Sequence, residues 1–160
     1  MVKLFRLHSQ MVTGIIEQAI TSHPLVAEAS VVGIPDAIKA QRPFAFITLS
    51  VRDHPSSAIP DDKLITGIQK RVREQIGGIA TLGGVIQGKG IVPKTRSGKT
   101  LRRVLRELLE NAVHGEFEKN IVLPATIEDV STVEAARGKI AEYFKIRGTE
   151  HRAIEARAKF

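Results

Sequence analysis

The chain has 160 residues, of which 42% are hydrophobic, enough for one folded unit with a core, and it has no cysteine for a disulfide framework or a thiolate nucleophile. Its formal net charge of +7 suits anionic partners, but aromatic residues make up only 4% of the chain and tryptophan is absent, which argues against a stacking platform for nucleic acid. No apolar run approaches the ~20 residues of a membrane-spanning helix. We therefore expect neither nucleic acid nor a membrane as a partner. The expected location is intracellular, in the cytoplasm or else in mitochondria.

The first third of the chain predicts one helix followed by two strands. Residues 1–11 are expected to form an irregular segment. Between positions 13 and 22 the apolar residues fall on one helical face, and Pro24 ends that pattern. Residues 26–34 are rich in small and β-branched side chains, and residues 44–49 form an apolar run after Pro43. We expect these two runs to be neighbouring strands.

The remaining pattern predicts two further helices around a short third strand. Asp61 and Asp62 open a helix whose apolar residues recur every three or four positions until Gly77 stops it. Val85 and Ile86, between glycines, predict a short third strand. The last core helix carries one apolar stripe, formed by Leu101, Val104, Leu105, Leu108, Leu109 and Ala112. The predicted fold is α+β: a small sheet of about three strands flanked by helices, with a partly helical tail at 113–160.

Residues 93–99 read PKTRSGK and are followed by TLRR. Ser97 and Gly98 predict a flexible turn that brings backbone N–H groups close to an anion, and Lys99 adds a mobile charge with three donors. This combination suits a phosphate or a carboxylate. A Walker A loop is excluded, because that motif needs glycine at the position occupied by Pro93.

The eleven residues 93–103 resemble the C-terminal signature of the acyl-adenylate-forming family, the acyl-CoA synthetases and their relatives, and most of all the acetyl- and propionyl-CoA synthetase branch. Two further stretches agree in order and spacing: residues 23–36 read HPLVAEASVVGIPD, and residues 72–77 read VREQIG. The resemblance implies an AMP-binding enzyme C-terminal domain at 12–112 and a C-terminal extension at 113–160. Members of the family normally carry a much larger N-terminal domain.

The resemblance also implies roles for individual residues. Lys99 matches a lysine that enters the active site of the larger domain and contacts the acyl carboxylate and the α-phosphate during adenylation; its charge would offset the charge developing on phosphoryl oxygens. Arg73 matches the position that contacts the phosphate of the CoA nucleotide. The candidates for a phosphate loop or a domain interface are Arg96, Ser97, Gly98, Arg102 and Arg103. A solvated helix face is an equally good interpretation of the helix arginines.

No metal site is predicted, because the histidines, at positions 8, 23, 54, 114 and 151, lack the spacing of a metal motif or a catalytic triad. ATP with Mg²⁺, and CoA, are the substrates that the resemblance implies for a complete enzyme. We expect this chain alone to bind none of them, since the phosphate-binding loop, the adenine pocket and the acyl pocket belong to the large domain.

One stretch departs from the family pattern. Members have a hinge with an acidic residue and then a Gly-His-Arg-like segment, whereas residues 7–14 here read LHSQMVTG, and we expect the hinge to be truncated at Met1. The first hypothesis is therefore the mobile C-terminal domain of an acid-thiol ligase, inactive alone and dependent on a large N-terminal adenylation domain in the same chain or in a partner. The alternative is a non-catalytic interaction module or a truncated product without its own activity.

Overall fold

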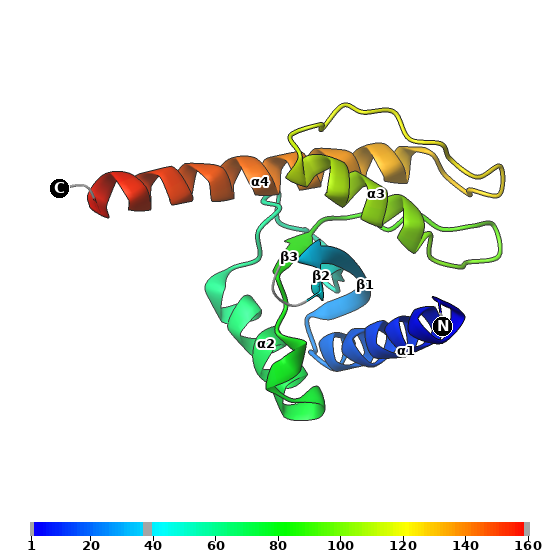
Figure 1. Cartoon of the computed structure of the whole chain (residues 1–160), viewed down its shortest axis with the longest axis horizontal. Helices are drawn as coiled ribbons and strands as arrows, with labels where there is room; N and C mark the ends of the chain where they lie inside the picture. Colours follow the sequence, from blue (N-terminus) through cyan, green and yellow to red (C-terminus); the bar gives the residue numbers. More distant parts are fainter. Residues whose placement is uncertain (1, 37–39, 159–160) are drawn as a thin grey trace.

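The computed structural model describes residues 2–36 and 40–158 and contains a three-stranded sheet between two pairs of helices (Figure 1). The elements follow the order α1 (Val2–Thr21), β1 (Val26–Asp36), β2 (Ala40–Leu49), α2 (Asp62–Ile76), a 3₁₀ turn (Gly78–Ala80), β3 (Gly84–Gln87), α3 (Arg102–Val113) and α4 (Ser131–Ala158). The predicted α+β class and three-stranded sheet are confirmed. None of the helices in the described ranges is long and apolar enough to cross a membrane.

The sheet is mixed and buried on both faces. β2 lies in the centre, antiparallel to β1 and parallel to β3. Successive strand residues alternate between two hydrophobic clusters: Val31 belongs to the cluster beneath α1 and α2, whereas Val32 belongs to the cluster beneath α3 and α4. The same alternation separates Ala45 from Phe46. Burial on both faces explains why the strands appear in the sequence as nearly continuous apolar runs.

Two helix boundaries differ from the prediction. Residues 2–11 were expected to be irregular, which is wrong, because α1 begins at Val2; no proline or glycine interrupts the chain from there to Val12. The α3 helix begins at Arg102, since Leu101 N donates to Pro93 O and holds the preceding residues in a turn. The predicted start of α2 is confirmed, with the Asp61 side chain accepting from Leu64 N at 2.8 Å.

The C-terminal tail contributes to the core. Val133, Ala136, Ile140 and Tyr143 of α4 are buried in the same cluster as residues of the sheet and of α3. Just before α4, the Asp129 side chain accepts from Ser131 N at 2.9 Å. The partly helical tail is therefore confirmed, and the buried residues of α4 pack against the sheet.

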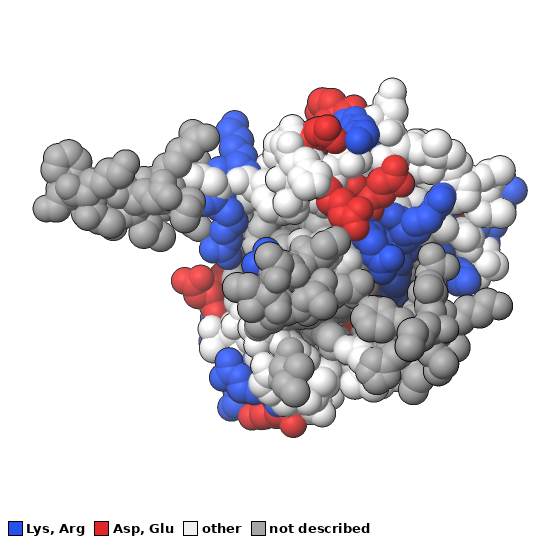
Figure 2. All heavy atoms as spheres, in the orientation of Figure 1, with Lys and Arg blue, Asp and Glu red and all other residues white. Residues whose placement is uncertain are grey.

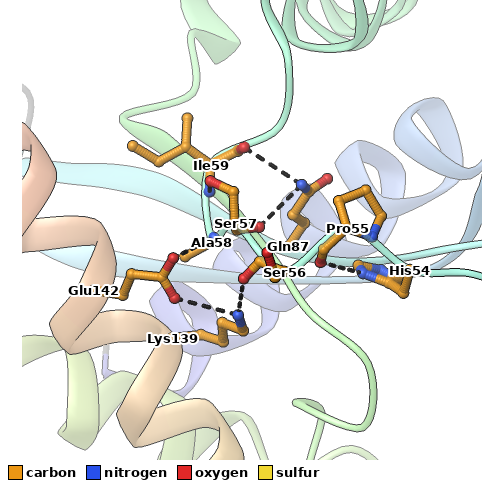
Figure 3. Close-up of polar contacts among 9 residues, drawn as sticks. All are labelled: His54, Pro55, Ser56, Ser57, Ala58, Ile59, Gln87, Lys139 and Glu142. Carbon is orange, nitrogen blue, oxygen red and sulfur yellow. Dashed lines mark hydrogen bonds and ion pairs between the residues drawn. The ribbon is translucent and has the colours of Figure 1, made fainter.

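Polar contacts also attach α4 to the loop between β2 and α2 (Figure 3). The Lys139 ammonium donates to Ser56 O, and the Glu142 carboxylate accepts from Ala58 N at 3.1 Å. On the other side of this loop, the Gln87 side chain of β3 donates to Ser57 O at 3.0 Å. These contacts satisfy backbone groups of a loop that has no regular secondary structure.

Candidate functional site

Residues 94–100 form a tight hairpin that carries Lys99. Lys94 and Thr100 are bridged antiparallel, Thr95 N donates to Lys99 O at 2.8 Å, and Gly98 N donates to Thr95 O at 2.8 Å. Gly98 has φ +85°, a left-handed conformation that side-chain-bearing residues rarely adopt. A three-residue hairpin turn that ends in such a residue is a common geometry. The turn expected here is present, and its shape depends on Gly98.

Three backbone donors of this turn are used inside the fold. Lys99 N donates to Thr95 Oγ1 at 3.1 Å, Gly98 N donates to Thr95 O, and Arg96 N donates to Thr126 O at 3.0 Å. These three N–H groups are therefore not available to cradle an anion as the sequence interpretation suggested. An anion at this hairpin therefore depends chiefly on side chains such as that of Lys99.

The Lys99 side chain is exposed and has no ion pair or hydrogen bond with any described residue. Arg96 and Ser97 are exposed beside it. The neighbouring Lys94 is different, because its ammonium lies 2.7 Å from the Glu28 carboxylate of β1. The hairpin thus presents one lysine with its charge uncompensated and uses the other to attach itself to the sheet.

The two helix arginines that follow the hairpin differ in their surroundings. Arg102 is half-buried and binds the carboxylate of Glu17 on α1, with Nη2 2.7 Å from both oxygens. Arg103 is exposed and has no bond to any described residue. Figure 2 shows basic side chains gathered over the α3 end of the molecule, next to a group of acidic ones. Of this pair, only Arg103 is unengaged and accessible to a ligand or a partner domain.

Arg73 lies on the last turns of α2, and its side chain is exposed. A hollow of about 20 Å³ adjoins it, and its lining also includes Gln69 of α2 and five residues around the 3₁₀ turn: Gly77, Gly78, Ala80, Thr81 and Leu82. This volume holds one water molecule or two. Arg73 therefore offers a surface contact for an anion and not an enclosed site.

A larger open groove of about 780 Å³ shares Gln69 and Leu82 with that hollow. It lies between α2, α4 and the start of β3, and aromatic rings of Phe44 and Tyr143 line it. Its two arginines, at positions 42 and 147, already have interactions. Sequence reasoning did not find this groove, because its lining comes from separate elements.

The structure does not bring Arg73 and Lys99 together. The hairpin between β3 and α3 and the helix α2 lie toward opposite sides of the molecule in Figure 1. Within the described part of the chain, no group of three His, Asp or Glu side chains is arranged to hold a metal ion.

One contributor to the hairpin was missed by sequence reasoning. Thr95 forms an antiparallel bridge with Ile127, a residue of the segment before α4. An isolated bridge between distant segments leaves no periodicity in the sequence, so no local pattern predicts it.

The model of the AMP-binding enzyme C-terminal domain matches residues 15–99 of this chain. Acetyl-coenzyme A synthetase of Novosphingobium aromaticivorans is 43% identical over 125 residues, which cover 78% of this chain and 18% of that enzyme. The 3-hydroxypropionyl-coenzyme A synthetase of Metallosphaera sedula is 36% identical over 132 residues, 82% of this chain and 18% of the relative. Among solved structures, acetoacetyl-CoA synthetase from Streptomyces lividans has the same fold, with a TM-score of 0.59, 21% identity and coverage of 80% of this chain and 18% of that one.

Proposed function

Because the chain belongs to the family of AMP-binding enzyme C-terminal domains, we propose that it is the mobile C-terminal domain of a short-chain acyl-CoA synthetase of the acetate or propionate type. Its function requires a large N-terminal adenylation domain, in the same chain or in a partner. ATP with Mg²⁺ and CoA are substrates of that complete enzyme. Lys99 serves the adenylation step, and Arg73 contacts CoA.

The observation that carries this proposal is the presentation of Lys99. The ammonium is exposed and unpaired at the end of a hairpin held by Gly98. A lysine in this state gives up no existing ion pair when it enters an anionic site, so its charge is fully available to a ligand.

In the adenylation step, a carboxylate oxygen of the acid forms a bond to the α-phosphorus of ATP, and the bond to the departing pyrophosphate breaks. Negative charge develops on the phosphoryl oxygens, and the Lys99 ammonium stabilises it without transferring a proton. In the second step, the sulfur of CoA forms a bond to the acyl carbon and AMP leaves. Arg73 binds a phosphate of the CoA nucleotide through its planar donors.

The separation of the two residues supports a domain that works in two poses. Since the hairpin that carries Lys99 and the helix α2 that carries Arg73 lie toward opposite sides of the molecule (Figure 1), one fixed pose would not present both to a single active site. A rotation between the half-reactions presents each residue in turn.

The test joins residues 12–160, through a restored hinge, to the large domain of an acetyl-type synthetase and measures the half-reactions separately. Lys99→Ala is expected to slow adenylate formation by about 10²-fold or more, the scale of losing one preorganised electrostatic contact, and to spare thioester formation from supplied acyl-adenylate. Arg73→Ala should raise the KM for CoA and spare adenylation.

Lys89→Ala and Arg52→Ala are the matched controls, because both side chains are exposed and have no bonds among the described residues. Both controls should behave as the unsubstituted fusion does. Damage to the same half-reaction by Lys99→Ala and Arg73→Ala would refute the two-pose assignment. An unchanged adenylation rate in Lys99→Ala would favour the alternative, a non-catalytic interaction module.

A further inference from the structure

We infer that residues 126–128 position Lys99 for adenylation by pairing with its hairpin as an added strand. The inference rests on the proposed role of Lys99. It assigns a positioning function to a part of the tail that lies outside the region matched by the family model, which ends at residue 99.

The pairing has the geometry of an antiparallel ladder. Arg96 N donates to Thr126 O at 3.0 Å, and Glu128 N donates to Lys94 O at 2.9 Å. The two bonds flank the bridge between Thr95 and Ile127. Because Thr95 also exchanges bonds with Lys99, the added strand lies one residue pair away from the lysine.

The added strand is itself attached to the core on its C-terminal side. Glu128 is followed by Asp129, whose side chain accepts from Ser131 N, the first residue of α4, and α4 is buried through Val133 and Ala136. Ile127 is partly buried against the same hydrophobic cluster. A continuous series of contacts therefore runs from the core through α4 and the added strand to the hairpin.

The hairpin strand that pairs with residues 126–128 has a second attachment, the ion pair between Lys94 and Glu28 of β1. This pair is half-buried, with both side chains 35% exposed, and a pair so accessible to water holds the hairpin only weakly on its own. The backbone pairing with residues 126–128 adds two hydrogen bonds to the same strand and so restricts movement of the hairpin further. A lysine that must reach a reacting phosphate needs a fixed position. A substitution far from the reaction that moves such a group by about 1 Å can lower the rate by up to about 10²-fold.

The test compares Glu128→Pro with Glu128→Ala. Proline removes the N–H that bonds to Lys94 O, whereas alanine removes only the exposed side chain and keeps the N–H. In the full 160-residue chain, hydrogen exchange at Arg96 N should accelerate at least tenfold in Glu128→Pro and stay unchanged in Glu128→Ala. Exchange at buried strand amides such as Ile47 N should be equal in both variants and shows that the fold is intact.

In the complete synthetase made with a large adenylation domain, Glu128→Pro should lower the kcat of adenylation by about 10- to 10²-fold. It should leave the KM for CoA and the thioester half-reaction unchanged, a selectivity that general loss of structure would not give. If Glu128→Pro does not fold, insertion of two glycines between Glu128 and Asp129 provides the same test, because it keeps every donor and detaches the strand from α4.

A folded Glu128→Pro variant that adenylates at the normal rate, while Lys99→Ala is slow, would overturn the positioning role and leave the proposed function standing. Equal losses in both half-reactions would also overturn it. A normal rate in Lys99→Ala would refute the proposed function first, and the positioning role with it.

Discussion

Arg102 of α3 donates to both carboxylate oxygens of Glu17 on α1, with Nη2 2.7 Å from each, and so joins two helices that cover opposite faces of the sheet. Glu17 Oε1 also accepts from Val31 N of β1 at 2.9 Å. β1 is an edge strand, and Val31 N is therefore an edge donor that this carboxylate satisfies. The pair therefore satisfies one donor of this edge strand and links it to α3.

Arg102→Ala should lower the free energy of unfolding by about 1–2 kcal/mol. Hydrogen bonds to charged groups contribute about 1.5–3 kcal/mol, and partial exposure of the guanidinium reduces that figure. Arg103→Ala, at the exposed neighbouring position, should change stability by less than about 0.5 kcal/mol. Urea unfolding of the two variants measures the difference. Equal stability of the variants would show that the Arg102–Glu17 pair contributes nothing.

Ile140→Ala tests whether α4 belongs to the folded core. The Ile140 side chain is 1% exposed within the cluster that α4 shares with the sheet, so its truncation should cost about 2–5 kcal/mol. The control is Val122→Ala, at a side chain that is 80% exposed, which should be nearly neutral. An unchanged unfolding transition in Ile140→Ala would mean that α4 is not packed on the sheet in solution.

Stability should decline on the acidic side because of His23. Burial, and then the positive charge of Arg71, lower the pKa of His23 below its ordinary value of 6.5. The folded state therefore binds fewer protons than the unfolded state. The contribution of His23 to the free energy of unfolding is complete above about pH 6.5 and is lost as the pH falls below that value. Leu25 N donates to His23 Nδ1 at 3.2 Å, a bond that protonation of Nδ1 would also break.

His23→Asn removes the titration and keeps a side-chain acceptor. Thermal unfolding of both proteins between pH 7.5 and pH 5 should show a smaller loss in the variant, because the other titrating groups are common to the two chains. Identical pH dependence of the two proteins would contradict the assignment to His23.

The 160-residue chain alone should give no ATP–pyrophosphate exchange with acetate or propionate. The hollow beside Arg73 is a surface depression of about 20 Å³ and the neighbouring groove of about 780 Å³ is open, and neither lies at the Lys99 hairpin. Radiolabelled pyrophosphate exchange measures this directly, with a complete acetyl-type synthetase as the positive control. Clear exchange by the isolated chain would be incompatible with a domain that depends on a larger partner.

Local chemistry in the sequence was sufficient for several features. Asp61 and Gly77 bound α2 as expected, because a cap and a helix stop act within one turn of the helix. The apolar runs of β1 and β2 predicted neighbouring strands, because both faces of the sheet are covered. Gly98 predicted the turn before Lys99, since the left-handed conformation is a property of that residue.

Tertiary structure alone decided the partners of the charged residues. Arg102 and Glu17 are 85 positions apart, and no periodicity links them, so the sequence left Arg102 equally suited to a ligand, an interface or solvent. The partner of the Arg96 N–H could not be predicted from the sequence for the same reason, because it bonds to Thr126 O in a segment that pairs only after the chain has folded back. Local propensities act within a few residues, whereas these contacts exist only because packing on the sheet brings distant segments together.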